Sequence, residues 1–338
     1  MERKKNKGIT LIALIITIVV LLILAVVAIN AITGDGIIAH ARNAQKNYMD
    51  ATKREEDLLK YYEGVLNTQE IMPTVAELQE KYEFSYYTTL SKAIEDVNGE
   101  TTANADSTKE NAGAGIYKDE NNNVVVVLLK NTEEASKLTI NKNVELNLGG
   151  NTITLTTNEA ELYFGTSTTA TINGMLQGSK IQKDVSGDAS VAPKLINANG
   201  ANISVQGGEY LCKVNNTTSG CLPIKINITN DANIKYCKIY SENSKNATGI
   251  QLQANSANIE NSVIEVNSSV NGMAQGIKPV KAKMPNTQIK NSVIKGTSNE
   301  RKLHCNISLW ANEYYRCRSD RFFYKGDCVW NRKLYNRC

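Results

Sequence analysis

The chain has 338 residues and a net charge of +4, which suggests one or two domains with appendages. Its basic residues are scattered rather than clustered, and this argues against a nucleic-acid-binding surface. Aromatic residues make up only 6% of the chain, too few for a large aromatic core. Asn, Thr, Ser and Gly are abundant from about residue 100 to 298, which favours short strands and turns over helices.

The N-terminal segment is a long apolar run behind a basic leader, residues 1–8. Residues 9–32 carry no charged side chain, and four of the seven residues before Gly8 are basic. A helix over this run would be roughly 36 Å long, enough to cross a hydrocarbon core of about 30 Å. Because basic flanks stay in the cytoplasm, we expect a single-pass anchor with the rest of the chain outside. The run is too long for an ordinary signal peptide, although Val26-Val27-Ala28 fits a cleavage site.

The basic leader, Lys7-Gly8 and the opening of the apolar run at Ile9 resemble the N-terminal segment of type IV prepilins and pseudopilins. The resemblance implies that a prepilin peptidase cuts after Gly8, that Ile9 becomes the N-methylated terminus, and that other pilin-like subunits are partners. The family usually has Phe or Met at the first mature position and Glu at the fifth, where this chain has Ile9 and Ala13. The family's Glu is thought to pair with a neighbouring subunit's terminal amine, so Ala13 weakens the case for a long pilus. A simple N-terminal anchor helix is the alternative.

The segment after the anchor predicts a helical stalk over residues 33–66. Thr33-Gly34-Asp35-Gly36 interrupts the helix, and apolar residues such as Tyr48, Leu58 and Tyr62 then recur at roughly helical spacing. Residues 67–123 predict short helices and a polar linker or N-terminal cap. One helix opens with a Thr74–Glu77 capping box, a second covers residues 88–97, and the polar residues 98–123 predict a flexible loop.

From Val124 the pattern becomes one of strands, and a degenerate repeat follows. VVVVLL at 124–129 predicts a buried strand, and residues 138–155 alternate apolar and polar. Five short strands are then centred on isoleucines 25 to 31 residues apart: Ile172, Ile203, Ile234, Ile259 and Ile289. A second apolar position follows five residues later in the last three repeats, at Ile239, Ile264 and Ile294. Stacked coils would bury these isoleucines in continuous columns, which is the organisation of a parallel β-helix.

Residues 86 to about 298 resemble the pectin-lyase-like right-handed parallel β-helix superfamily of bacterial surfaces. YYTTLSKAIEDV, VVVVLLKN and KLTINKNVELNLGGNTITL carry the resemblance, which implies a capping helix followed by the first coil. We therefore expect an all-β solenoid over residues 124–298, preceded by a long transmembrane helix. Asn261 and Asn291 occupy equivalent turn positions, where asparagines hydrogen-bond along a column. An antiparallel β-sandwich is the alternative fold.

Catalytic patterns are scarce in the repeats. Lyases of the superfamily that these repeats resemble typically use an arginine base and carboxylate-bound calcium. This chain has no arginine between Arg54 and Arg301. The histidines, His40 and His304, fall outside the repeats, and no metal-ligand cluster or cofactor motif is visible. Of the carboxylates, Glu260 and Glu265 share a coil, but their odd separation on a strand points them to opposite faces unless a turn intervenes. The other candidates are Glu209 and Asp231. We therefore expect a non-enzymatic protein.

Lysines and cysteines of the later coils suggest other roles. The basic side chains could dock an anionic wall polymer or glycan, or simply keep the surface soluble: Lys225, Lys235, Lys238, Lys278, Lys281, Lys283, Lys290 and Lys295. Cys212 and Cys221 are close enough in the chain to close a disulfide loop. Cys237 aligns with Ser262 and Ser292, which indicates a packing role for a small side chain.

The tail, residues 299–338, differs from the rest. It has six arginines against three in the preceding residues, and it holds both tryptophans and four of the seven cysteines. One interpretation is a disulfide-stapled cap on the solenoid, and the other is out-of-frame translation.

Together these patterns predict a pilin-like membrane protein that displays a β-helix outside a Gram-positive cell. Its role would be adhesion, binding of a cell-wall polymer or host glycan, or that of a minor pilin or pseudopilin. The alternatives are a carbohydrate-active enzyme, either a polysaccharide lyase or a glycoside hydrolase, on the same solenoid, and a truncated product without a function of its own.

Overall fold

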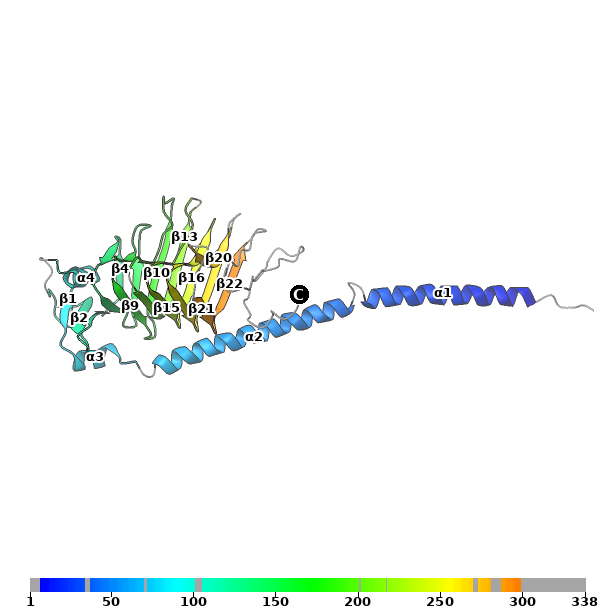
Figure 1. Cartoon of the computed structure of the whole chain (residues 1–338), viewed down its shortest axis with the longest axis horizontal. Coiled ribbons are helices and arrows are strands. Elements are labelled where there is room, and N and C mark those ends of the chain that lie inside the picture. Colours follow the sequence, from blue (N-terminus) through cyan, green and yellow to red (C-terminus); the bar gives the residue numbers. More distant parts are fainter. Residues whose placement is uncertain are drawn as a thin grey trace, which may run out of the picture. The chain divides into compact units, whose positions relative to one another are not determined.

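The structure, a computed structural model, describes residues 7–33, 37–69, 72–100, 105–200, 202–216, 218–269, 273–280 and 287–298. The chain divides into two compact units, residues 1–56 and 57–338. The first unit contains helix α1 (Lys7–Thr33) and the first part of helix α2 (Ile37–Gln69), both blue in Figure 1. The predicted interruption at 34–36 and the tail at 299–338 lie outside the described residues.

The second unit contains the end of α2 and a short mixed segment. Helix α3 (Val75–Lys81) opens with the predicted capping box: the Thr74 backbone N–H donates to the Glu77 carboxylate at 2.7 Å, and the Glu77 N–H donates to Thr74 Oγ1 at 3.3 Å. Helix α4 (Leu90–Asn98) follows the three-residue strand β1 (Ser85–Tyr87) and confirms the second predicted helix. It ends at Gly99, whose φ of 79° is a left-handed conformation that glycine adopts without strain.

The prediction of a flexible loop over residues 98–123 was wrong for part of that range. Strand β2 (Ala114–Lys118) lies there and pairs antiparallel with both β1 and strand β3 (Val124–Leu128). Ala114 and Tyr117 are buried. The tertiary pairing, rather than the local composition, determines this strand.

From β3 onward each coil contributes one strand to each of three sheets, except the last described coil, which contributes strands to sheets A and B. Sheet A continues from β3 through β6 (Val144–Asn147), β9 (Thr169–Gly174), β12 (Asn202–Gly207), β15 (Asp231–Lys235), β18 (Ser256–Glu260) and β21 (Thr287–Lys290). Sheet B contains β4 (Thr132–Glu134), β7 (Thr152–Leu155), β10 (Lys180–Ser186), β13 (Glu209–Asn215), β16 (Lys238–Asn243), β19 (Val263–Ser268) and β22 (Val293–Ser298). Sheet C contains β5 (Leu138–Ile140), β8 (Leu162–Phe164), β11 (Ile196–Ala198), β14 (Ile224–Asn227), β17 (Ala247–Gln253) and β20 (Ala274–Pro279).

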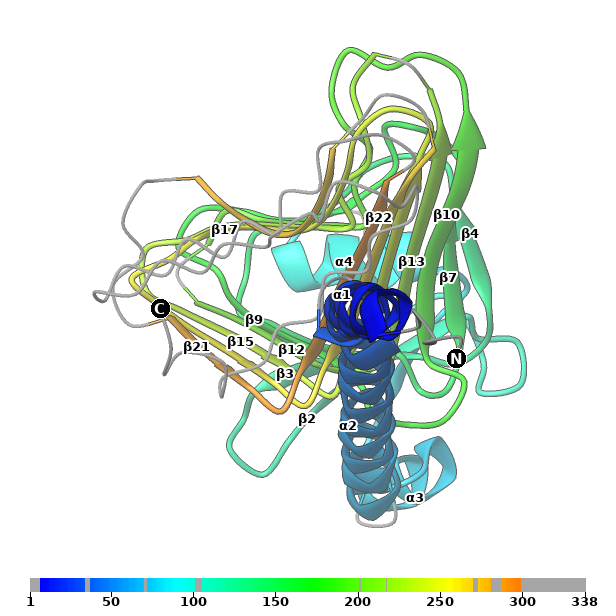
Figure 2. The same cartoon turned by 90° about the vertical axis from the view of Figure 1, so that its right-hand side faces the viewer.

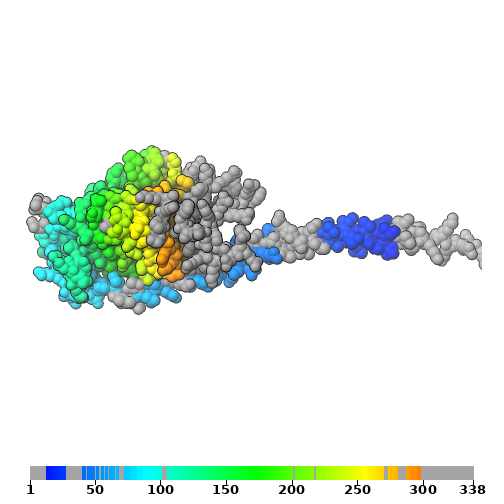
Figure 3. Space-filling view, viewed as in Figure 1, coloured from blue at the N-terminus to red at the C-terminus, as the bar shows by residue number. Residues whose placement is uncertain are grey.

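All described strand pairs from β3 to β22 are parallel, and neighbours in each sheet come from successive coils. This arrangement confirms the predicted β-solenoid and excludes the antiparallel sandwich. Figure 2 looks nearly along the stack and shows the three sheets around one interior, with α4 across it. Leu90, Ala93 and Ile94 of α4 belong to the same hydrophobic core, so α4 caps the first coil as predicted. Figure 3 shows the coils packed side by side, from cyan to orange.

In sheet A the core column confirms four of the five predicted isoleucines. Val126, Leu146, Ile172, Val205, Ile234, Ile259 and Ile289 stack in register. The prediction was wrong at Ile203, which instead pairs with Ala170 and Ala232. Ile203 and Val205 are both apolar and both point inward, so alternation alone does not fix which of them joins the column.

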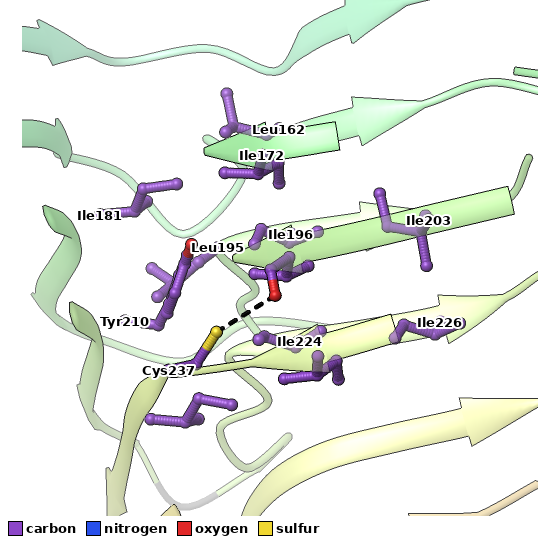
Figure 4. Close-up of a cluster of buried hydrophobic side chains, with 14 of the residues drawn as sticks. Leu162, Ile172, Ile181, Leu195, Ile196, Ile203, Tyr210, Ile224, Ile226 and Cys237 are labelled. Carbon is purple, nitrogen blue, oxygen red and sulfur yellow. Dashed lines mark hydrogen bonds between the residues drawn. The ribbon is translucent and has the colours of Figure 1, made fainter. Parts of the chain in front are cut away.

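In sheet B a second column confirms the other predicted apolar positions. Ile153, Ile181, Tyr210, Ile239, Ile264 and Ile294 stack in register. Figure 4 shows Tyr210 between Ile181 and Cys237, with its ring in the interior. Tyr210 is fully buried, and its hydroxyl has no hydrogen-bond partner among the described residues.

The corner between sheets A and B is a tight turn with a left-handed residue. Tyr236, Asn261 and Asn291 have φ values of 57°, 47° and 47°, so the predicted equivalence of the two asparagines is confirmed. The predicted asparagine hydrogen bonds were wrong, because serines one residue later link the coils. Ser262 Oγ accepts from the Cys237 N–H at 3.2 Å, and Ser292 Oγ accepts from the Ser262 N–H at 3.1 Å.

The end of α2 packs on this corner. Leu58 and Tyr61 contact Val263 and Val293 on the outside of sheet B. Tyr61 is 7% exposed, whereas Tyr62, which the helical spacing favoured, is 52% exposed. The predicted stripe is therefore confirmed at Leu58 and wrong at Tyr62, because Tyr61 takes the packed position instead.

Candidate functional site

Helix α1 presents apolar side chains without a partner in the described structure. Between Leu14 and Val27 the large apolar side chains are 47% to 64% exposed. Thr17 Oγ1 donates to backbone carbonyls of its own helix, to Leu14 at 2.8 Å and to Ala13 at 3.1 Å. The hydroxyl is therefore satisfied inside the helix, and the surface of α1 stays apolar.

Within the described residues, no helix meets the length and hydropathy that a membrane crossing requires. The described side chains of α1 are those of residues 13–27, so Gly8 and Ile9 have no described side-chain environment. Ala13, at the position of the family's Glu, is exposed.

The outer face of sheet A carries two rows of polar side chains, one residue to either side of the core column. The first row is Glu145, Thr171, Ser204, Asn233, Asn258 and Gln288. The second row is Asn147, Asn173, Gln206, Lys235, Glu260 and Lys290, of which Asn147 and Asn173 are buried. We call this surface the amide face, because amide side chains are its commonest members. Its first coils are neutral apart from Glu145, and its last coils alternate lysine and glutamate.

An open pocket of about 400 Å³ lies on the amide face. Ser204 and Gln206 of β12 and Asn233 and Lys235 of β15 line it, together with two corner residues, Met175 and Tyr236. Gln206 Nε2 donates to Ser204 Oγ at 3.0 Å, and this hydrogen bond fixes the orientation of the Gln206 amide in the pocket. The pocket thus combines neutral hydrogen-bonding groups with one aromatic ring.

Gly64 of α2 explains how Tyr236 is held at this pocket. A Cβ atom on Gly64 would lie 2.7 Å from Cε1 of the Tyr236 ring, so the ring packs against the bare backbone of the helix. Sequence analysis missed this pair because the two residues lie far apart in the chain. It also missed the amide face, although alternation places these residues beside the predicted core isoleucines.

Lys235 and Glu260 form an ion pair at the charged end of the amide face. Lys235 Nζ lies 3.3 Å from Glu260 Oε2, and Lys290 follows Glu260 in the same row. Burial acts to raise the pKa of the Glu260 carboxyl, but hydrogen bonds from Lys235 and Asn258 outweigh it and the pKa is lowered. Glu260 is therefore an ionised partner of lysine rather than a proton donor at neutral pH.

The four predicted carboxylates do not form a pair. Glu260 lies in sheet A and Glu265 in sheet B, because the turn at Asn261 comes between them. Glu209 forms ion pairs with Lys238 at 3.1 Å and with Lys180 at 3.5 Å. Asp231 accepts a hydrogen bond from the Ser256 hydroxyl at 2.6 Å.

The predicted basic residues are divided among the sheets. Of those described, two lie in each sheet: Lys235 and Lys290 in A, Lys238 and Lys295 in B, and Lys225 and Lys278 in C. Residues 281 and 283 lie outside the described part. The described lysines therefore form no single stripe. Among the described residues, no group of three or more His, Cys, Asp or Glu side chains gathers as a metal site would.

The cysteines of the coils are free thiols inside the solenoid. Cys212, Cys221 and Cys237 are buried, and Cys237 takes the small-residue position predicted for it beside Ser262. Cys221 Sγ lies 3.3 Å from the Cys212 carbonyl oxygen, so the two predicted disulfide partners are in contact. The disulfide itself stays a prediction.

Comparison with known proteins identifies the N-terminal segment. Residues 3–29 match the family model described as "Prokaryotic N-terminal methylation motif". The match includes Gly8, Ile9 and Ala13, so the chain carries a prepilin-type motif despite alanine at the fifth mature position. No curated protein and no solved structure matches the chain. The predicted fusion of a prepilin-type segment with a β-solenoid is thus confirmed in both parts.

Proposed function

We propose that this protein is a membrane-anchored, pilin-like surface protein that binds glycans through the amide face without cleaving them. The methylation motif at residues 3–29 supports processing by a prepilin peptidase and association with other pilin-like subunits. The exposed apolar side chains of α1 support insertion among lipid tails or apolar helices. The solenoid would then be displayed outside the cell.

The main support for glycan binding is the pocket beside Tyr236. Sugar hydroxyls both donate and accept hydrogen bonds, as the amides of Gln206 and Asn233 and the Ser204 hydroxyl do. An aromatic ring beside such groups offers an apolar surface to the C–H face of a pyranose. Beyond the pocket the first row continues through Asn258 and Gln288 on the next two coils, so a linear glycan of several residues fits better than a single sugar.

We further propose that the glycan is neutral. The lysine of the pocket, Lys235, is committed to Glu260, and Glu260 is flanked by Lys290 in register. An anionic polymer would need unpaired cations along its path. Adhesion to a surface that bears neutral glycans is the biological role that this chemistry supports.

The proposed absence of catalysis rests on the carboxylates. Hydrolysis of a glycosidic bond uses two carboxyl groups that flank it. Glu260 is paired with Lys235, Glu209 is paired with two lysines, and Glu265 lies on another sheet. Incubation of the full chain with neutral glycans and uronates is expected to release neither reducing ends nor unsaturated products. Turnover that disappears in Glu260→Gln or Glu265→Gln would overturn this proposal.

Binding is tested with the detergent-solubilised full chain and chito-, cello- and malto-oligosaccharides in calorimetry. Tyr236→Asn removes the ring but keeps a residue suited to the left-handed turn, as at Asn261. We expect it to lower affinity at least about five-fold. Tyr163→Asn is the matched control, because Tyr163 is a half-buried tyrosine beside Lys137 on sheet C.

The affinity of a neutral glycan is expected to change little between low and high salt. Binding only to anionic polymers, with loss of affinity in salt, would contradict the neutral ligand. Equal losses in Tyr236→Asn and Tyr163→Asn would contradict the amide face as the site.

A further inference from the structure

Three side chains with reactive heads meet inside the solenoid, away from the amide face. Lys183 of β10 and Cys212 of β13 are direct register partners on the inner face of sheet B. Cys221 precedes β14 and forms an isolated parallel bridge with Ala247. Their exposures are 1%, 0% and 2%, so all three are sealed in the core.

The two thiols are held against each other by the backbone. Cys221 Sγ donates to the Cys212 carbonyl oxygen at 3.3 Å. Burial raises the pKa of the Cys212 thiol well above its ordinary value, and a hydrogen bond with the Cys221 thiol raises it further. The Cys221 N–H donates to the Asn246 carbonyl at 2.9 Å, and β13 is paired on both sides by β10 and β16. The two cysteines are thus in contact while each keeps its place in its parallel ladder.

We propose that Cys212 and Cys221 form a disulfide in the mature protein, and that Cys237 remains a thiol. The oxidising compartment follows from the proposed surface location, whereas the pairing follows from the geometry alone. The bond would join the middle of β13 to the segment just before β14 and close the excursion between these strands in the fourth coil.

The reaction is an exchange with the disulfide of a thiol–disulfide carrier. The Cys212 thiolate attacks one carrier sulfur, and the other leaves as a thiolate. The Cys221 thiolate then displaces the carrier from the mixed disulfide. Two protein thiols are thereby oxidised to one disulfide, and the carrier disulfide is reduced to two thiols. Because both sulfurs are buried in the folded chain, the exchange takes place before this coil is packed.

The Lys183 amine lies beside its register partner Cys212 in the folded chain. Its Nζ donates to the carbonyl oxygens of Ala160 at 2.5 Å and Asn158 at 3.0 Å, which holds the charge in the interior. Cys237 lacks such a neighbour. Its Sγ lies at the corner of sheets A and B, 3.2 Å from the Lys235 carbonyl oxygen and 3.4 Å from that of Val205.

The test is peptide mapping of the full chain recovered from the membranes of its native host. Free thiols are alkylated under denaturing, non-reducing conditions, and the protein is digested with trypsin. Cleavage after Lys194, Lys213 and Lys225 places Cys212 and Cys221 on separate peptides, 195–213 and 214–225. The expected result is one linked pair of these peptides and an alkylated Cys237.

Alkylation of Cys212 or Cys221, or a bridge from either to Cys237 or to the cysteines beyond residue 299, would overturn the proposal. A second arm makes the result independent of location: reduced full chain is unfolded and refolded in a glutathione redox buffer. Formation of the same linked pair there, but not in protein from the host, would support the geometry and count against the surface location. Failure to form the pair in both arms would reject the disulfide.

Stability gives a second readout. Reduction of the linked protein is expected to lower its Tm by several degrees, because the closed loop no longer restricts the unfolded chain. Cys212→Ser and Cys221→Ser are expected to show the lower Tm with or without reductant. Cys237→Ser is the matched control and is expected to keep the response to reductant. An unchanged Tm of the wild-type chain on reduction would count against a bond at this place.

Discussion

At the scale of single residues, the solenoid depends on a few side chains in uncommon settings. Left-handed residues at the corner of sheets A and B and a lysine in the core are the clearest cases. The asparagines at the corner have an evident reason, because asparagine tolerates positive φ better than most residues. The reason for Lys183 is less evident, since a charge in the core lowers the stability of the fold unless its hydrogen bonds are made.

The corner asparagines yield the first prediction. Asn261 has a φ of 47°, where a Cβ-bearing residue without a compensating side chain is strained. Asn261→Ala is expected to lower the free energy of unfolding by about 1 to 2 kcal/mol. Asn261→Gly should change it by less than about half as much, because glycine adopts this conformation without a steric penalty. Urea denaturation of the three proteins measures the difference, and equal stability of the alanine and asparagine proteins would contradict the strain argument.

Lys183 yields a prediction for pH. Burial lowers the pKa of this amine from 10.5 to about 8 in the folded chain. Between these values the unfolded chain binds more protons than the folded chain, so stability rises as pH increases through that window. The contribution is about 3 kcal/mol from pH 8 to 10.5. Below pH 8 the amine is charged in both states, and the full penalty of burying the charge is present.

Lys183→Met is the matched control for this pH dependence, because it keeps a long side chain and removes the titrating group. Other lysines and the tyrosines titrate in both proteins and cancel in the comparison. We expect the difference in free energy of unfolding between the wild-type and Met proteins to change across pH 8 to 10.5 in favour of the wild type. Urea midpoints at several pH values measure it, and parallel pH profiles would show that Lys183 titrates normally.

At the scale of elements, alternation predicted the solenoid but not its details. A period of two places one apolar residue in the core and its neighbours outside, so the columns through Ile234 and Ile239 could be predicted. The register at Ile203 could not, because two inward positions of that strand are apolar. Strand β2 was missed because its short Gly-containing sequence becomes a strand only between β1 and β3.

The candidate site also has one part that alternation could predict and one part that it could not. The polar rows of the amide face lie beside predicted core residues and were within reach of the alternation pattern. The place of Tyr236 in the pocket could not be predicted, because it depends on the packing of α2 against a corner far along the chain. Contacts of this kind leave no periodic signal in the sequence.

The contact of α2 with Tyr236 yields a prediction at this scale. Gly64 lies inside a helix, where glycine costs about 1 kcal/mol relative to alanine. Gly64→Ala is nevertheless expected to destabilise the wild-type protein, because the new Cβ would meet the Tyr236 ring at 2.7 Å. In a Tyr236→Asn background the ring is absent, and Gly64→Ala should then stabilise by up to about 1 kcal/mol. A double-mutant cycle by urea denaturation measures the coupling, and the same effect of alanine in both backgrounds would contradict the contact.

At the scale of the whole molecule, the chain joins two parts with different surfaces. The solenoid buries its apolar residues internally and presents polar rows outward. The described side chains of α1 do the opposite, since the large apolar ones are exposed. The methylation motif at residues 3–29 covers most of this apolar helix, which supports the proposal that the helix is kept on the mature protein for insertion and assembly.

Processing of that helix is the last prediction. We expect cleavage after Gly8 and a methylated Ile9 as the first mature residue, which leaves the apolar helix on the protein. Mass spectrometry of the N-terminal peptide from the native host separates this product from an intact Met1 terminus and from removal of the helix near Ala28. Gly8→Leu should block cleavage, because the peptidase must approach the backbone closely there, and Ala13→Glu is the companion variant. If alanine weakens packing into a filament, glutamate should raise the amount recovered in sheared surface fractions, because a carboxylate would meet a terminal ammonium in a low dielectric. A mature terminus at Met1 or Ile29 would contradict the pilin-like processing and leave the solenoid unaffected.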